Sequence, residues 1–257
     1  MSLVLIHNEQ FRVATFDVDQ RESMTITAIA RYLQETSHLH SDRLGSSAGQ
    51  LLHNQFWMMA GLRIRMIRYP RWREEIRIET YPTAFEQIFG RRDFTLYDAE
   101  SNVCGIAAQR WMIIDIERRR PVRIPEHIRA LVPQFPKEPH PLIFDEAHTH
   151  APTAIAETSY QVRQSDIDMN HHANHTAYIK WALDELPDTI HQTKVLEHIA
   201  IDFRLECMLH DTVQLAVYPR TDVLAEDETV SFVHLLTNHE KLSARVISSW
   251  KNAPILP

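Results

Sequence analysis

Glycine and long apolar runs are both scarce in this chain of 257 residues. Only five glycines are present, and all of them lie in the first half. This scarcity disfavours a glycine-rich dinucleotide-binding domain. No segment approaches the roughly 18–20 consecutive apolar residues of a membrane-spanning helix, so we expect no membrane span. The first residues have neither a basic region nor a small-residue cleavage site, which argues against a signal peptide.

Cysteine is also rare, because Cys104 and Cys207 are the only two. Two cysteines are too few for a disulfide framework, and we therefore expect a cytoplasmic protein in a reducing compartment. The net charge of −7 argues against a nucleic-acid partner. The charge is uneven: residues 1–140 hold 19 basic and 17 acidic residues, whereas residues 141–257 hold 8 and 17. A basic patch for an acidic partner would therefore lie in the first half.

Proline is concentrated where the chain divides. Six of the thirteen prolines fall between Pro121 and Pro141. Because proline interrupts helices and central strands, this stretch indicates a connector. We expect an N-terminal domain over residues 1–130, a connector over 131–152 and a C-terminal domain over 153–257.

The two halves repeat each other at two constant offsets. An offset of 149 aligns Phe11-Arg12-Val13 with Tyr160-Gln161-Val162, and Asp17 and Asp19 with Asp166 and Asp168. An offset of 137 aligns Leu62, Ile64, Met66, Ile76, Ile78 and Tyr81-Pro82 with Ile199, Ile201, Phe203, Val213, Leu215 and Tyr218-Pro219. Two offsets in the same order favour a duplicated unit.

Each unit shows a strand, a helix and then several strands. Residues 25–39 carry apolar side chains at helical spacing, and Asn174 is a good N-cap for a second helix. The later segments 62–66 and 199–203 alternate apolar and polar residues, as half-buried antiparallel strands do. One helix wrapped by an antiparallel sheet, twice over, predicts an α+β double hot-dog architecture.

A polar segment distinguishes the second unit from the first. Asp168, Asn170 and His172 precede the second helix, whereas the first unit has Arg21 and Ser23 at the positions of Asn170 and His172. Likewise, Glu206-Cys207 corresponds to Tyr69-Pro70. We infer a single active site in the second unit. The alternative is a loop whose polar residues only cap the helix, although Asn174 alone suffices for that.

Two further motifs carry less weight. Residues 45–49 fit the G-x-S-x-G nucleophile elbow, but that elbow needs a strand-to-helix turn in a parallel sheet, and here a helix precedes it. His171, His172 and His175 lie close together without an accompanying Cys-x-x-Cys or His-Glu-x-x-His motif. We therefore expect neither a metal nor a cofactor.

Taken together, these motifs resemble the acyl-acyl-carrier-protein thioesterases, and the chain is similar to the short bacterial form of that family. The resemblance implies a double hot-dog fold and hydrolysis of fatty acyl thioesters to free fatty acid. It rests on a D-x-N-x-H motif followed by Glu-Cys, and on several first-half segments. They are Asp168, Asn170 and His172, then Glu206-Cys207, with Leu33-Gln34-Glu35-Thr36, Arg68-Tyr69-Pro70-Arg71-Trp72, Gly90-Arg91-Arg92-Asp93, Arg119-Arg120 and Ile124-Pro125.

The attacking group has two candidates at this stage. Cys207 can be a nucleophile paired with His172, or Glu206 can be a base that activates water. Cys207 shares the strand phase of the apolar residues Ile199 and Ile201, which favours an inward thiol, but a bulge can break that phase. We favour Glu206. Asn170 can orient the water or the carbonyl, and Asp168 can orient its neighbours.

The first half is expected to bind the substrate. Apolar Trp57, Met58, Met59 and Met66 are candidates for an acyl tunnel. Arg119 and Arg120, in the run Arg118–Arg120, are candidates for docking acyl carrier protein. A homodimer is compatible with the sequence. The rivals to this function are an acyl-CoA thioesterase, a hot-dog dehydratase and a non-enzymatic acyl-binding module.

Overall fold

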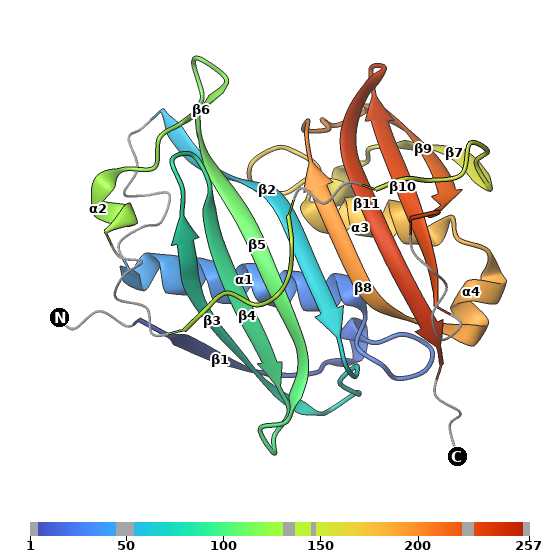
Figure 1. The fold of residues 1–257 in the computed structure, drawn as a ribbon, viewed down its shortest axis with the longest axis horizontal. Coiled ribbons are helices and arrows are strands. Elements are labelled where there is room, and N and C mark those ends of the chain that lie inside the picture. The colour runs from blue at the N-terminus through green and yellow to red at the C-terminus, as the bar shows by residue number, and fades with distance from the viewer. Residues whose placement is uncertain (1–4, 45–53, 131–136, 145–147, 223–228, 254–257) are drawn as a thin grey trace. The chain divides into compact units, whose positions relative to one another are not determined.

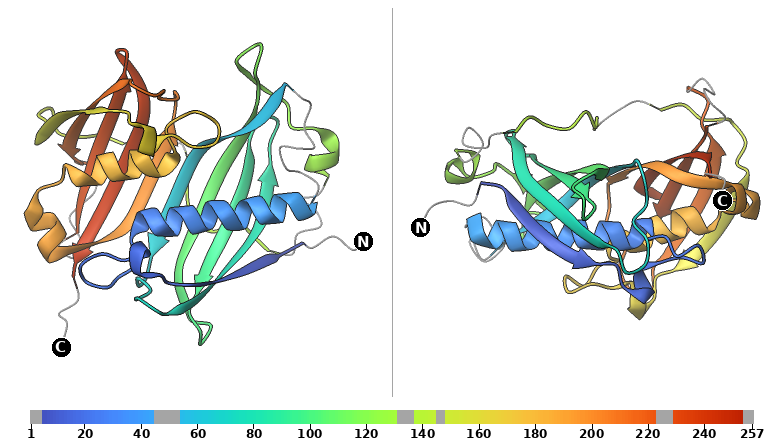
Figure 2. Two further views of the ribbon diagram at one scale, coloured as in Figure 1. Left: turned by 180° about the vertical axis from the view of Figure 1, so that it is seen from behind. Right: turned by 90° about the horizontal axis from the view of Figure 1, so that it is seen from below.

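The computed structural model describes residues 5–44, 54–130, 137–144, 148–222 and 229–253. The chain divides into two compact units, Met1–Leu142 and Ile143–Pro257, and the division falls within the predicted connector. Each unit consists of an antiparallel sheet and a helix that lies across one face of it (Figures 1 and 2). The predicted helix-wrapped sheets are therefore confirmed in both halves.

The first unit begins with β1 (His7–Arg12), a short 3-10 turn (Thr15–Asp17) and the long helix α1 (Ile26–Leu44). Its sheet has the strand order β1-β3-β4-β5-β2, in which all neighbours are antiparallel. The strands are β2 (Gln55–Met66), β3 (Glu75–Phe85), β4 (Gly90–Tyr97) and β5 (Val103–Asp115). The short strand β6 (Arg120–Val122) pairs with β5, and α2 (Glu126–Arg129) follows it.

The second unit repeats this order. β7 (Ala156–Gln161) leads into a 3-10 turn (Gln164–Asp166), α3 (His175–Asp184) and α4 (Asp188–Thr193). The sheet has the order β8-β11-β10-β9-β7, again antiparallel throughout. Its other strands are β8 (Lys194–Phe203), β9 (Thr212–Pro219), β10 (Val230–Asn238) and β11 (Lys241–Asn252).

The core of the first unit lies between α1 and one face of its sheet. Ile29 and Leu33 project from α1 at helical spacing and are fully buried, as are Leu62, Ile78 and Phe94 on the strands. Burying each such side chain stabilises the fold by roughly 1.5–3 kcal/mol. Arg92 identifies the same sheet face, because its Nη1 contacts Nδ1 of His40 on α1 at 2.8 Å.

The proline-rich connector is partly attached to the first sheet. The guanidinium of Arg91 donates hydrogen bonds to the carbonyls of His140 and Leu142, at 2.7 and 3.0 Å. The His140 N–H donates to the carboxylate of Asp93, which also pairs with Arg91. Residues 140–142 therefore run along β4 of the first unit rather than forming a free linker.

Two expectations concern a nucleophile motif and a membrane span. The G-x-S-x-G motif at residues 45–49 lies outside the described part of the chain. Among the described helices, none combines the length and apolar character needed to cross a membrane.

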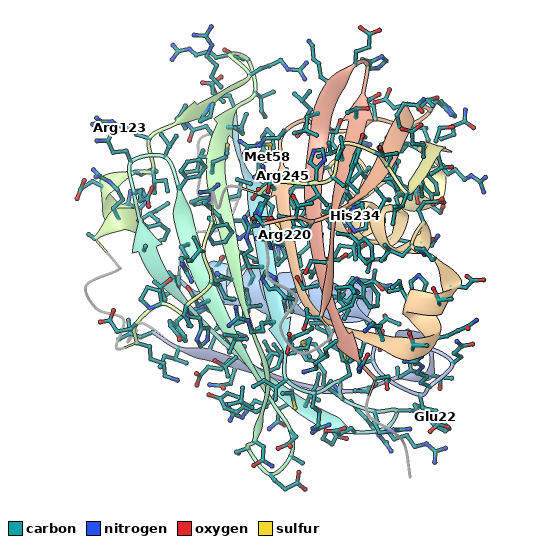
Figure 3. The ribbon with its side chains drawn as sticks, turned by 45° about the vertical axis from the view of Figure 1, so that its right-hand side comes forward. Glu22, Met58, Arg123, Arg220, His234 and Arg245 are labelled. Carbon is teal, nitrogen blue, oxygen red and sulfur yellow. The ribbon has the colours of Figure 1, made fainter. Side chains whose placement is uncertain are left out.

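The second unit buries a histidine that the strand pattern did not single out. His234 on β10 is fully buried, and its Nε2 lies 2.9 Å from the Ser248 hydroxyl (Figure 3). Burial lowers its pKa to about 3. In the unfolded chain a histidine takes up its proton near pH 6.5, so protonation below that pH favours unfolding.

We expect the protein to lose stability as the pH falls from 7 to 5, with His234 contributing about 2 kcal/mol of the loss. Urea unfolding at both pH values measures it. His234→Gln, which cannot titrate, should reduce the pH-dependent loss, whereas the exposed-site control His127→Gln should leave it unchanged. An equal loss in wild type and His234→Gln would contradict this assignment.

Candidate active site

The candidate site is built on the loop between the 3-10 turn and α3. The N–H of Asp168 donates to the His172 carbonyl at 2.9 Å, which closes the loop. The side chain of Asp168 accepts the Asn170 N–H at 2.8 Å, and His171 takes a positive φ of 65°. Tight closure of this kind fixes where the His172 side chain leaves the backbone.

The first unit contains the same loop. Its Asp19 N–H donates to the Ser23 carbonyl at 2.9 Å, and Glu22 has a φ of 58°. These residues stand at the 149 offset from Asp168, His172 and His171. The duplication inferred from the sequence is therefore present in the backbone hydrogen bonds.

Comparing the two units separates the residues that form the loop from those that only the second unit has. Asp19 Oδ1 accepts the N–H groups of Arg21 and Ser23, at 2.9 and 3.0 Å, in a loop without the polar constellation. Asp168 does the same for Asn170 in the second unit. Forming the turn is therefore sufficient to account for Asp168, whereas Asn170 and His172 are what the second unit adds.

The structure brings His172 and Glu206 together. His172 Nε2 lies 3.2 Å from Glu206 Oε2, and the two side chains are 25% and 29% exposed. This is the distance at which a proton can pass between an imidazole and a carboxylate. Partial exposure leaves both groups within reach of water and of a substrate.

Glu206 does not lie on a regular strand. β8 ends at Phe203, and the N–H groups of Arg204 and Leu205 both donate to the Ser243 carbonyl, at 2.8 and 3.1 Å. Because two consecutive N–H groups donate to one carbonyl, the side chains no longer alternate between the two faces of the sheet, as in a β-bulge. The alternation of β8 therefore stops after Phe203, and Leu205 is 44% exposed, but Cys207 is buried, as the strand phase of Ile199 and Ile201 favoured.

Cys207 lies beside the pair but faces inward. Its side chain has no exposed surface, and burial raises the pKa of its thiol. Its N–H donates to the hydroxyl of Tyr178 on α3 at 3.0 Å, and its carbonyl accepts the Ala173 N–H at 2.8 Å. A buried thiol with a raised pKa is a poor nucleophile.

Asn170 is exposed at the loop, next to the left-handed His171. The first N–H groups of α3 are used in the helix cap, because Asn174 Oδ1 accepts the Thr176 N–H and the Asn174 carbonyl accepts that of Ala177. The side-chain amide of Asn170 is therefore a more accessible donor for a carbonyl oxygen.

The predicted acyl-binding residues do not share one face. Across β2 and β5, Trp57 pairs with Ile113, Met58 with Met112 and Met59 with Trp111. Directly opposed residues point to the same side of a sheet, and neighbours along a strand to opposite sides. Arg92, on the α1 face, pairs with Gln109 of β5, so Trp57 and Met59, opposite Ile113 and Trp111, also face α1, whereas Met58 faces away from it. The register shift between Met59 and Gly61 brings Met66, opposite Gly105, to the α1 face as well.

Trp57 and Met66 also have packing roles. Trp57 packs against a buried cluster of Ile113, Ile124 and Ile128, near α2. Met66 is buried, and a Cβ added at Gly105 would lie 2.7 Å from its sulfur, so its packing requires glycine there. Ordinary core packing is sufficient to explain both side chains.

The predicted docking arginines lie on an exposed turn. Arg118, Arg119 and Arg120 occupy the hairpin between β5 and β6, which projects beyond the sheet in Figure 1. Within the part of the chain that the structure describes, no carboxylate forms an ion pair with any of the three. Their charges are therefore available to a partner.

The histidine group does not form a metal site in the described residues. The one cluster there with suitable spacing is Glu74, Asp98 and Cys104, in the first unit. Arg68 donates to both of its carboxylates, at 2.5–3.0 Å, so a guanidinium already supplies the positive charge.

A groove of about 650 Å³ lies elsewhere, over β7, β9 and β10. None of the predicted site residues lines it; it is formed by Glu157, Thr158, Ser159, Gln214, Leu215, Ala216, Tyr218, Leu235 and Thr237.

Tyr178 is a residue that the sequence analysis did not single out, although its hydroxyl accepts the Cys207 N–H at 3.0 Å. The signal that could have found it is a difference between the units: the second unit has Tyr178 and Cys207 where the first has Ile29 and Pro70.

Solved structures share this architecture. An acyl-ACP thioesterase from Bacteroides thetaiotaomicron matches 98% of this chain and 100% of its own, with a TM-score of 0.83 and 22% identity. A 12:0-ACP thioesterase from Umbellularia californica matches 97% and 95%, with a TM-score of 0.83 and 19% identity. At these identities the likeness establishes the fold, which is the predicted double hot-dog.

Sequence relatives and family models agree with the fold. Oleoyl-acyl carrier protein thioesterases of Coriandrum sativum and Arabidopsis thaliana are 29% and 30% identical over 88% and 81% of this chain. The matches span 65% and 62% of those plant proteins. The acyl-ACP thioesterase N-terminal domain model matches residues 5–132 and the C-terminal domain model residues 149–252. With both halves matched in order, the chain belongs to the acyl-ACP thioesterase family.

Proposed function

We propose that this protein hydrolyses fatty acyl thioesters of acyl carrier protein to free fatty acid and carrier protein. Family membership supports the reaction class. The observation that carries the assignment to this site is the 3.2 Å contact between His172 and Glu206 in the one unit that has both residues.

In the proposed mechanism, Glu206 takes a proton from water while the water oxygen bonds to the thioester carbonyl carbon. The Asn170 amide donates a hydrogen bond to the carbonyl oxygen as negative charge develops on it. The carbon–sulfur bond then breaks. The proton that Glu206 took from water passes across the 3.2 Å contact to His172, and His172 delivers a proton to the leaving sulfur, so both side chains return to their starting protonation states. Thiols are good leaving groups, with pKa values near 8.5 for a cysteine-like thiol, so this last transfer is undemanding.

The burial of Cys207 favours a mechanism in which water attacks the thioester over one in which the cysteine is the nucleophile. The thiolate is the reactive form, and burial disfavours it here.

The roles of Glu206 and Cys207 can be separated by substitution. Glu206→Gln should lower kcat on acyl-carrier-protein thioesters about 10²–10⁴-fold, because a positioned general base contributes that much. Cys207→Ala should stay within about threefold of wild type, since it keeps the backbone bonds and removes only the buried thiol. Release of free thiol measures both. Comparable losses in the two variants would instead favour the cysteine nucleophile.

We propose that the acyl chain lies on the α1 face of the first sheet. Met58 and Met59 provide a matched pair, because they are neighbours on opposite faces of β2. Met59→Trp should shift the preferred acyl length to shorter chains by filling space on the α1 face, whereas Met58→Trp should leave the preference unchanged. Hydrolysis rates across a series of acyl lengths measure the preference. An equal shift in both variants, or none in either, would argue against this location.

We propose further that acyl carrier protein, an acidic partner, docks on the arginine hairpin. Charge steering acts mainly on association and is weakened by salt. Arg119→Glu/Arg120→Glu should raise KM for acyl-carrier-protein substrates several-fold at low salt, while short acyl-CoA hydrolysis stays nearly constant. The control Lys241→Glu reverses an exposed charge in the second unit and should change neither. Equal losses on both substrates would mean that the arginines support the fold.

A further inference from the structure

Tyr178 connects helix α3 to the segment that carries Glu206. Its hydroxyl accepts the Cys207 N–H at 3.0 Å, and the residue is 3% exposed. The ring is held by Trp181 at 5.3 Å and by Phe203, edge-on, at 5.4 Å between centroids. A phenol fixed on three sides is a rigid support.

The site loop holds Cys207 on its carbonyl side. Its carbonyl accepts the N–H of Ala173, the residue after His172. Glu206 directly precedes Cys207, so the two bonds to the Cys207 backbone determine where the Glu206 side chain begins relative to His172. Loss of either bond would let the 3.2 Å spacing relax.

The first unit shows that the fold does not require this support. There Met24 donates to the Pro70 carbonyl at 2.8 Å, which reproduces the bond from Ala173 to Cys207. Pro70, however, has no N–H to donate, and Ile29 stands at the position of Tyr178. The tyrosine bond is thus present only in the unit that has the histidine–glutamate pair.

We propose that Tyr178 is a positioning residue for the reaction: through the Cys207 N–H it holds Glu206 at proton-transfer distance from His172. This proposal rests on the proposed function. It also gives the second unit a reason to have a residue other than proline at position 207, because only a residue with an N–H can be held by the phenol.

The first variant is Tyr178→Phe, which removes the hydroxyl and keeps the ring. We expect kcat on acyl-carrier-protein thioesters to fall about tenfold or more with KM within about twofold, because misplacement of a catalytic group affects the chemical step. The matched control is Tyr160→Phe. Tyr160 also stacks on Trp181, but its hydroxyl donates a hydrogen bond of 2.5 Å to Glu185 and not to the segment that carries Glu206. The kcat of Tyr160→Phe should therefore stay near the wild-type value.

The second variant separates positioning from folding. Tyr178→Phe leaves the buried Cys207 N–H without an acceptor, which itself destabilises the fold. Tyr178→Phe/Cys207→Pro removes the donor and the acceptor together and copies the Pro70 arrangement of the first unit. We expect it to recover melting temperature relative to Tyr178→Phe but not to recover kcat. Recovery of both would overturn the proposal and leave Tyr178 a purely structural role.

A double-mutant comparison and one measurement without substrate complete the test. In a Glu206→Gln background, Tyr178→Phe should cause no further loss of kcat, because the group that it positions is already disabled. The imidazole NMR signals of His172 should move in Tyr178→Phe and not in Tyr160→Phe. Unchanged kcat and His172 signals in Tyr178→Phe would overturn the proposal. An inactive wild type would overturn the proposed function instead, and the NMR comparison would still report on the tyrosine bond.

Discussion

The hydrogen bond from the Ala173 N–H to the Cys207 carbonyl is the constraint on which the candidate site depends. It joins a loop before a helix to a segment after a strand, which are more than thirty residues apart in the chain. His172 and Glu206 flank its two ends, so this backbone contact brings the two residues next to each other. A side-chain pair on two unconnected loops would have to pay the cost of ordering both.

The duplicated unit explains how such a site can arise without a new fold. The first unit keeps the loop closure at Asp19, the left-handed residue at Glu22 and the bond from Met24 to Pro70. Its backbone is therefore nearly that of the site, but Ser23 and Tyr69 stand where the second unit has His172 and Glu206. Function on this scaffold is set by a few side chains on a backbone that packing has already determined.

The same comparison redistributes the roles of the polar residues. Asp168 has a counterpart that forms the same turn in the first unit, which makes scaffolding a sufficient role for it. Cys207 is buried and held at both backbone ends, so its N–H and carbonyl, and not its thiol, are the groups that contact the site. The proposed mechanism therefore assigns the chemistry to His172, Glu206 and the exposed Asn170.

The sequence by itself determined the duplication, the helix-wrapped sheets and the polar segment, because repeat offsets and apolar periodicity are local signals. Tertiary structure alone decided where the strand alternation ends, which face of the sheet each side chain takes and which distant residues are in contact. The alternation of β8 ends at Phe203 because two N–H groups share the Ser243 carbonyl, and the apolar pattern of the strand does not encode that bulge. Met58 separated from Met59 because side chains alternate across β2. The proposed role of Tyr178 depends on α3 bringing its hydroxyl to a backbone N–H twenty-nine residues away, a contact that no sequence period records.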